Sequence, residues 1–323
     1  MSKIYEALLR AELERATTSG QPGQETGFSL NDLLTPQADQ SLAATEAEDA
    51  LIRDDRENIA HTFPDMSPAI LGHSALDLSQ VPHKPWQPML AALPALADKG
   101  AGVEQFRILR SRIAEFREQG PMKTVLVSSG LPGEGKSFVA INMALAFARH
   151  KGNRVLLIDG DMRRSSLHKV LGTTAFPGLT DYLSGAIPLA EVMQRPQTVP
   201  GGTLVQGLSS LVFIGGGKDA EKAGDLSASS RFAELVEQVS STFDWIIVDS
   251  SPANLVSDAV NLATACDGVL LVGREGITRF KTAQQAQLQF KTSTILGFVL
   301  NAVRKLPAKS DYYGNYDGYK ADA

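Results

Sequence analysis

A glycine-rich segment, residues 130–137, carries the clearest chemical signal in this chain of 323 residues. Gly130, Gly135, Lys136 and Ser137 fit the spacing G-x-x-x-x-G-K-[ST], between an apolar β-branched run and an apolar helical pattern. Glycines let successive backbone N–H groups face one anion, and the following helix N-terminus adds partial positive charge. The segment predicts a phosphate-binding loop, with Lys136 on the β- and γ-phosphates and the Ser137 hydroxyl on Mg²⁺. The predicted nucleotide contacts are Gly130, Pro132, Gly133, Glu134, Gly135, Lys136, Ser137 and Phe138.

Three carboxylates follow apolar runs elsewhere in the chain. Asp159 and Asp161 stand two residues apart after one run, and Asp249 ends another. A single aspartate in such a place is often only a turn former. Three of them beside a phosphate-binding loop supply the oxygen ligands that Mg²⁺ takes in proteins. We therefore predict that ATP and Mg²⁺ bind here, with Ser137 and one or more of these aspartates holding the metal directly or through water.

Two further polar residues are candidates for the same site. Arg163 follows the aspartate pair and either contacts a phosphate or a carboxylate or is an ordinary surface arginine. Asn301 follows the last expected strand and is a candidate for adenine recognition.

The elements that must position these residues alternate along the chain. Most expected strands are continuous apolar runs, which is typical of strands covered on both faces in a mainly parallel sheet. Strands that alternate with helices predict an α/β, doubly wound fold whose ligands lie beyond the carboxyl ends of the strands. We expect strands at 124–128, 154–159, 211–215, 245–249, 269–272 and 297–301, and helices at 103–116, 136–150, 229–242, 257–264 and 278–290.

Composition excludes several classes of protein. The net charge is −5, and residues 19–99 hold twelve acidic and four basic residues, a balance of −8, so a basic nucleic-acid binder is not indicated. The single cysteine rules out an internal disulfide. No apolar run reaches the length of a membrane span, and the N-terminus lacks the apolar region of a secretory signal. We expect a cytoplasmic protein.

The same patterns divide the chain into four parts. Residues 1–16 predict a short helix, which either docks on the main domain or on a partner or is a frayed terminus. Residues 17–100 are acidic, contain many prolines and show no sustained period, which predicts a disordered tether. Residues 101–306 form the expected P-loop domain. Residues 307–323 form a flexible tail, whose tyrosines are either sites of modification or an aromatic binding segment. These tyrosines are Tyr312, Tyr313, Tyr316 and Tyr319.

The motifs together resemble the bacterial tyrosine kinases, P-loop proteins related to the partition and septum-placement ATPases. Residues 129–137, 157–163 and 246–249 are similar to the family's Walker A, Walker A′ and Walker B motifs. Glu104, Arg107 and Arg110 match its E-x-x-R-x-x-R segment, and the clustered tail tyrosines match its autophosphorylated tail. The resemblance covers about residues 100–323. The first eight residues are similar to family members encoded with exosortase and exopolysaccharide systems.

The resemblance implies an ATP-dependent protein-tyrosine autokinase that phosphorylates its tail in trans and regulates exopolysaccharide synthesis or export. It implies catalytic roles for Lys136, Asp159, Asp161 and Arg163, with either Asp159 or Asp161 orienting or deprotonating the phenol. It also implies ring-like homo-oligomers held by Glu104, Arg107 and Arg110. The expected partners are an integral membrane polysaccharide co-polymerase, which recruits the kinase to the inner membrane face and activates it, and a tyrosine phosphatase. A kinase that needs no membrane partner is the alternative.

Three stretches depart from the family pattern. Ser165 replaces a common proline, residues 250–252 read Ser-Ser-Pro rather than Thr-Pro-Pro, and residues 215–222 replace a proline-rich stretch. Two other functions stay open: a nucleotide-switched ATPase of the partition type, and a catalytically inactive regulator. The partition type usually has a second lysine early in the phosphate loop, where residues 130–134 have none. Its membrane-binding members often end in a basic amphipathic helix, whereas this chain ends in a polar, glycine-containing segment.

Overall fold

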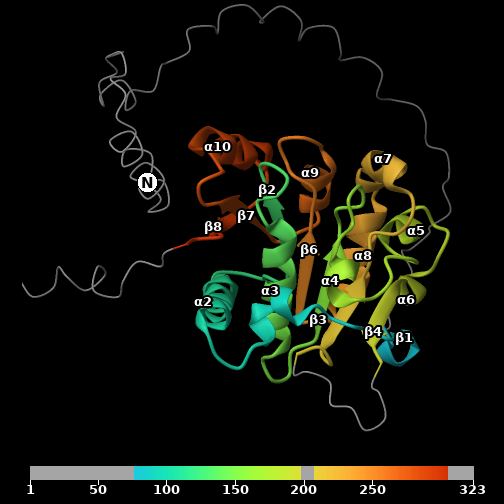
Figure 1. Cartoon of the computed structure of the whole chain (residues 1–323). Coiled ribbons are helices and arrows are strands. Elements are labelled where there is room, and N and C mark those ends of the chain that lie inside the picture. The colour runs from blue at the N-terminus through green and yellow to red at the C-terminus, as the bar shows by residue number, and fades with distance from the viewer. Residues whose placement is uncertain (1–75, 198–206, 305–323) are drawn as a thin grey trace, which may run out of the picture. The chain divides into compact units, whose positions relative to one another are not determined.

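The computed structural model describes residues 76–197 and 207–304 (Figure 1). The predicted N-terminal helix, most of the predicted tether and the tyrosine-containing tail lie outside the described residues.

One eight-stranded sheet runs through the domain in the order β1-β4-β5-β3-β6-β2-β7-β8. Neighbouring strands are parallel except for β4 and β5, which confirms the expected mainly parallel, doubly wound arrangement. The central strands β2, β3 and β6 are buried along their whole length, as their continuous apolar sequences predict. The strands are β1 His83–Lys84, β2 Thr124–Ser129, β3 Val155–Asp159, β4 Met193–Pro196, β5 Leu211–Ile214, β6 Trp245–Asp249, β7 Gly268–Arg274 and β8 Ile295–Asn301.

Helices cover both faces of this sheet (Figure 1). Buried side chains of α2, α3 and α4 share one apolar core with one set of strand residues, and those of α5 to α10 share a second core with the alternate set. The two cores follow from the period of two along each strand, which sends successive side chains to opposite faces. The helices are α2 Ala101–Glu115, α3 Lys136–Ala148, α4 Leu167–Leu171, α5 Leu179–Leu183, α6 Leu189–Val192, α7 Ala223–Ser227, α8 Arg231–Ser240, α9 Asp258–Ala263 and α10 Phe280–Gln289.

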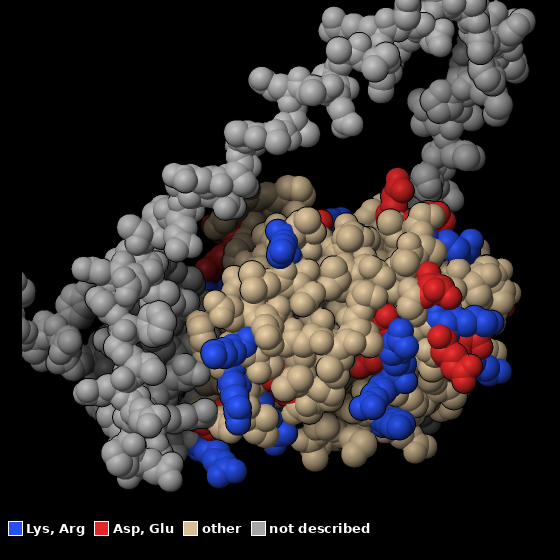
Figure 2. All heavy atoms as spheres, turned by 90° about the horizontal axis from the view of Figure 1, so that it is seen from above, with Lys and Arg blue, Asp and Glu red and all other residues tan. Residues whose placement is uncertain are grey.

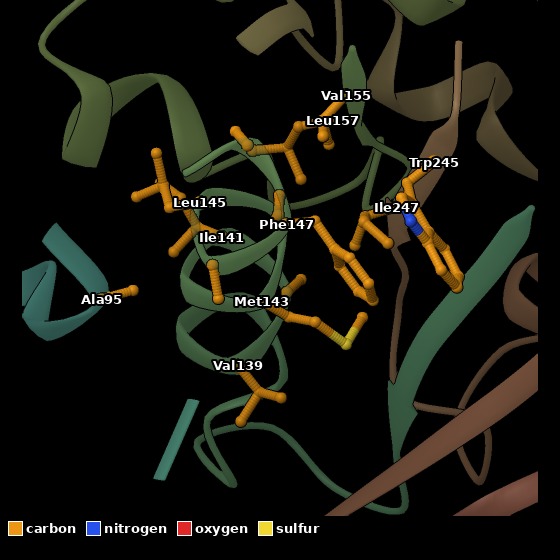
Figure 3. Packing of buried hydrophobic residues seen from close by; sticks show 14 of the residues in the cluster. Ala95, Val139, Ile141, Met143, Leu145, Phe147, Val155, Leu157, Trp245 and Ile247 are labelled. Atoms are coloured by element: carbon orange, nitrogen blue, oxygen red, sulfur yellow. The ribbon is translucent and has the colours of Figure 1, made fainter. Parts of the chain in front are cut away.

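Helix α3 is buried on all sides from Val139 to Ala148, as its almost entirely apolar sequence predicts. Figure 3 shows it between the segment that contains Ala95 and the strand that contains Trp245. Phe147 stacks on the Trp245 indole with ring centroids 4.0 Å apart. Because Lys136 begins this helix, the phosphate-binding loop is attached to one of the best-packed elements of the domain.

Residues 76–100 contradict the expectation of a disordered tether that extends to residue 100. Val81, Leu93 and Ala95 are each only 1% exposed, and the Trp86 ring packs edge-on against Phe213 at 6.3 Å. The segment contains β1, which adds to the edge of the sheet beside β4, and three 3₁₀ turns, at Leu78–Gln80, Leu90–Ala92 and Pro94–Leu96. Its scattered prolines hide any local period, so its order comes from apolar residues that dock on the finished domain.

The expected boundaries of the other main elements agree with the structure to within a few residues, but several short elements were not predicted. Helices α4, α5, α6 and α7 have four or five residues each, and β4 is a four-residue strand. Segments this short carry too little sequence for a period to appear.

The surface view in Figure 2 shows basic and acidic side chains interspersed around a broad uncharged area on that face. Within the described ranges, no helix has the length and apolar content needed to cross a membrane.

Candidate nucleotide-binding site

The register of the parallel sheet brings the predicted carboxylates together. Asp159 is the residue of β3 that pairs with Asp249 of β6, so both carboxylates leave the sheet at the same height. The backbone N–H of Gly160 donates to the carbonyl of Asp249 at 2.8 Å. A Cβ at Gly160 would lie 2.6 Å from that carbonyl oxygen, so only glycine allows β3 and β6 to remain this close beyond their ends.

The phosphate-binding loop has the backbone conformation that its glycines predict. Gly133 and Gly135 have φ angles of 81° and 95°, which side-chain-bearing residues rarely adopt. The Asn301 amide donates to the Glu134 carbonyl at 3.0 Å and lies where a side chain at position 135 would be. Asn301 therefore contacts the loop itself, and the adenine contact stays a prediction.

The side chain of Glu134 holds the loop from inside. It is fully buried, and its carboxylate accepts the backbone N–H of Leu131 at 2.8 Å and the hydroxyl of Thr278. Arg274, at the end of β7, donates to the carbonyl of Gly133 at 3.1 Å. The turn between β7 and α10 thus stabilises the loop, a contribution that no local motif indicated.

Lys136 lies among the acidic residues. Its Nζ is 2.6 Å from Asp161 Oδ2, 3.9 Å from Asp249 Oδ1 and 3.3 Å from the Ser137 hydroxyl. Burial lowers the pKa of Lys136. The negative charges of Asp249 and Asp161, and to a smaller extent that of Asp159, together outweigh burial and raise the pKa above its ordinary value. The ammonium is therefore a permanent positive charge in the site.

Asp159 and Asp249 are fully buried and incompletely paired. Asp159 Oδ2 accepts the Ser165 hydroxyl at 2.8 Å and the N–H groups of Ser166 and Leu167 at 3.0 Å each, whereas Oδ1 has no partner. Burial raises the pKa of Asp159 against these hydrogen bonds. Burial also raises the pKa of Asp249 to about 7, against the effect of Lys136 and with Asp159 adding to the rise.

Neither Asp249 oxygen has a hydrogen-bond partner of good geometry, although the Ser137 hydroxyl is near enough to lower the carboxyl pKa.

These oxygens fit Mg²⁺ only in part. Three buried carboxylate oxygens without partners and one hydroxyl are the hard ligands that this ion prefers. No group of three or more histidine, cysteine or acidic side chains in the described part of the chain is arranged to hold a metal by itself. Mg²⁺ usually takes one or two carboxylates together with waters and substrate phosphates. The residues thus fit an ion that arrives with a nucleotide.

Arg163 pairs with a carboxylate, one of the alternatives left open above. Its Nε and Nη2 donate to Asp258 Oδ2 and Oδ1 at 2.7 and 3.1 Å. Asp258 is 1% exposed, so this pair ties the loop after β3 to the start of α9. A catalytic role for Arg163 remains a prediction. The sequence reasoning overlooked Asp258, which only the fold brings to Arg163.

The remaining predicted residues lie on or beside α2. Phe138 is partly exposed and packs against Phe106 with ring centroids 5.7 Å apart. Glu104 and Arg107 form an exposed ion pair, and Arg110 donates to the carbonyl of Ala146 on α3 at 3.2 Å. Their role in oligomers stays a prediction.

Known proteins resemble this chain over the same region. A family model described as an AAA domain matches residues 122–284. The tyrosine-protein kinase YwqD of Bacillus subtilis is 31% identical over 225 residues, which cover 68% of this chain and 90% of that protein. The tyrosine-protein kinase CpsD of Streptococcus agalactiae is 32% identical over 216 residues, covering 66% and 89%. The kinase domain of the Escherichia coli tyrosine kinase ETK superimposes with a TM-score of 0.59 at 27% identity, covering 67% and 82%.

Proposed function

Because this chain belongs to the family of bacterial tyrosine-protein kinases, whose P-loop domain binds a nucleotide, we propose that it is an ATP-dependent autokinase. Its substrate would be the tail of a second copy, with Tyr312, Tyr313, Tyr316 and Tyr319 as acceptors. The observation that supports this most directly is the meeting of Lys136 with three aspartates at the phosphate-binding loop, at the carboxyl end of the sheet.

The proposed reaction is an attack of a tyrosine oxygen on the γ-phosphorus of ATP. The new O–P bond forms as the bond to the β-phosphate oxygen breaks, and ADP leaves with the electron pair of that bond. Lys136 would neutralise charge on the phosphates, and the loop N–H groups would hold them. Ser137 and Asp249 would hold Mg²⁺, which would supply positive charge that offsets the charge of the phosphates.

One carboxylate would take the phenol proton. Asp161 is held by Lys136 at 2.6 Å, whereas Asp159 Oδ1 is buried without a partner. Burial also raises the pKa of Asp159, which brings it closer to that of a phenol, near 10. We therefore assign the role of proton acceptor to Asp159. Asp161 would instead act with Lys136 beside the phosphates.

The finer regulation is also part of this proposal. Glu104 and Arg107 are exposed on α2, where they are free to contact a second copy. The expected outcome is a ring-like oligomer whose tails reach neighbouring sites. By family likeness, a membrane polysaccharide co-polymerase would activate the kinase and recruit it to the membrane, a phosphatase would reverse the modification, and exopolysaccharide synthesis would be the regulated process.

The test is to incubate the purified protein with labelled ATP and Mg²⁺ and to measure phosphotyrosine. Wild type should gain label, Lys136→Met should gain none, and a variant with the four tail tyrosines changed to Phe should lose most of it. A full rate without any membrane protein would remove the activator from the proposal. ATP hydrolysis without phosphotyrosine would instead favour the partition-type ATPase, and neither reaction would favour an inactive regulator.

A further inference from the structure

Two loops at the carboxyl end of the sheet form one hydrogen-bonded unit, joined through Ser165 to the nucleotide site. Residues 173–178 follow α4, and residues 215–218 follow β5. Gly178 and Gly215 pair as a parallel bridge, the Gly217 N–H donates to the Ala175 carbonyl at 3.1 Å, and the Leu179 N–H donates to Gly215 at 2.7 Å.

The approach of these loops depends on glycine. A Cβ at Gly215 would lie 2.5 Å from the Ala175 carbonyl oxygen. At Gly217, where φ is 89°, a Cβ would lie 2.0 Å from the Thr180 hydroxyl. The loops are therefore held in one arrangement, and this is one of the stretches where the sequence departs from the family pattern.

This unit presents an aromatic ring with one cation on its face, and a second cation, from β1, is bonded to the same loop. We call these three residues, Phe176, Lys218 and Lys84, the Phe176 platform. The Phe176 side chain is 39% exposed, although a ring of this size is usually buried. Lys218 Nζ lies 3.3 Å from the centroid of that ring, and Lys84 Nζ donates to the Thr174 hydroxyl at 3.2 Å. Among the described residues, neither lysine forms an ion pair with a carboxylate.

The platform is connected to the reactive carboxylate through two contacts. A Cβ at Gly216 would lie 2.6 Å from the Ser165 Cβ, so the loop backbone rests on Ser165. The Ser165 hydroxyl in turn donates to Asp159 at 2.8 Å. The loop that carries Lys218 is therefore joined to Asp159 through Ser165.

We infer that the Phe176 platform is the docking site for the acidic tyrosine-containing segment of a second copy's tail, residues 311–319. This segment reads Asp-Tyr-Tyr-Gly-Asn-Tyr-Asp-Gly-Tyr and carries two negative charges without a positive one. The catalytic aspartates repel such a peptide, and the two unpaired lysines offset that repulsion. A tyrosine ring can also pack against the exposed face or edge of Phe176. The binding itself is argued from charge and shape. Its consequence, phosphorylation of the docked tail, rests on the proposed kinase function.

The experiment measures binding and catalysis separately. A fluorescent synthetic peptide of residues 311–319 with both ends blocked, which keeps the two negative charges, is titrated with the full-length protein. Its phosphorylation is then followed with a full-length protein whose own tail tyrosines are Phe. Both measurements are made with a protein that has no change in the platform and with three platform variants, Lys218→Glu, Lys218→Arg and Phe176→Ala. Lys291→Glu, a charge reversal at an exposed site after α10, is the matched control.

Lys218→Glu should raise both the Kd and the KM for the peptide about fivefold or more, while kcat at saturating peptide changes less than about twofold. Lys218→Arg should restore binding, and Lys291→Glu should have no effect. A peptide with Asp311→Lys and Asp317→Lys should bind Lys218→Glu better than it binds wild type.

Unchanged peptide affinity in both Lys218→Glu and Phe176→Ala would overturn the docking site even if wild type phosphorylates the peptide. Peptide binding that depends on the platform but leads to no phosphotyrosine would support the docking site and overturn the kinase function instead. A peptide that does not bind to wild type would overturn the inference outright. Equal weakening by Lys291→Glu would show only a general charge effect and would also overturn it.

Discussion

Asp249 is a charged residue in an environment that favours its neutral form. Its side chain is fully buried, neither oxygen has a good hydrogen-bond partner, and burial raises its pKa to about 7. A buried carboxylate without partners lowers the stability of the free protein, and a bound cation removes this cost.

Asp249→Asn should therefore stabilise the nucleotide-free protein while abolishing kinase activity. The pKa of Asp249 is higher in the folded state than the unfolded value near 3.8, so the stability that its proton provides is lost as pH rises from about 4 to about 7. The variant has no such loss, and its melting temperature should exceed that of wild type by roughly 2–6 °C at pH 8 and by less at pH 5. Thermal unfolding at both pH values checks this.

Asp161→Asn is the matched control for that measurement, because Asp161 directly pairs with Lys136 at 2.6 Å. This variant should not be stabilised. A lower melting temperature for Asp249→Asn than for wild type at pH 8 would contradict the account of Asp249.

Glu134 holds the backbone of the phosphate-binding loop, so we expect it to affect nucleotide binding through that backbone. Glu134→Ala would leave the Leu131 N–H and the Thr278 hydroxyl without their carboxylate partner. We expect about tenfold weaker ADP binding by calorimetry, equivalent to ~1.4 kcal/mol, with an unchanged circular dichroism spectrum. Glu237→Ala, at an exposed position of α8, is the control. Equal affinities for both variants would show that the loop keeps its shape without Glu134.

At the scale of elements, an ion pair joins the loop after β3 to helix α9. Asp258 is 1% exposed, so Arg163→Ala would leave a buried carboxylate without its partner. Because Arg163 is itself 39% exposed, we expect a loss of about 2 kcal/mol, less than for a fully buried pair. The double variant Arg163→Ala, Asp258→Asn should recover part of it in urea unfolding. A double variant less stable than Arg163→Ala alone would argue against the pair.

The segment 76–100 behaves as part of the domain because it is anchored to α3. The Asn142 side chain accepts the Ala95 N–H and donates to the Ala92 carbonyl, both at 3.1 Å. Removal of residues 1–100 should therefore lower the melting temperature markedly relative to removal of residues 1–75, because Leu93 and Ala95 leave an apolar core. Equal melting temperatures would show that this segment contributes nothing to the fold.

At the scale of the whole molecule, the predicted regulation is a change of assembly with phosphorylation. Each phosphotyrosine adds about −1.5 to −2 charges, and four of them in one tail would repel one another and the acidic site. Light scattering should show an oligomer before ATP treatment and a smaller species afterwards. The variant with the four tail tyrosines changed to Phe should remain assembled. The same size for both proteins under both conditions would exclude this mechanism while leaving kinase activity possible.

Much of this protein could be predicted from local sequence. The phosphate-binding loop depends on glycines with positive φ, Gly133 and Gly135, and on a helix that begins at Lys136, all encoded within a few residues. The continuous apolar runs of β2, β3 and β6 likewise predicted a buried parallel sheet. A short-range pattern records such features because backbone conformation and side-chain period are local properties.

Other features depend on contacts between residues far apart in the chain. The register that sets Asp159 beside Asp249, the pairing of Arg163 with Asp258, and the Thr278 hydroxyl on Glu134 each join separate elements. The order of residues 76–100 and the exposed Phe176 ring beneath Lys218 belong to the same class. The sequence by itself determined six of the eight strands of the sheet, the loop and the chemistry available at their ends. Only the tertiary structure decided which polar groups meet, which stay unpaired in the core and which pKa values shift, because burial and pairing arise when distant segments pack together.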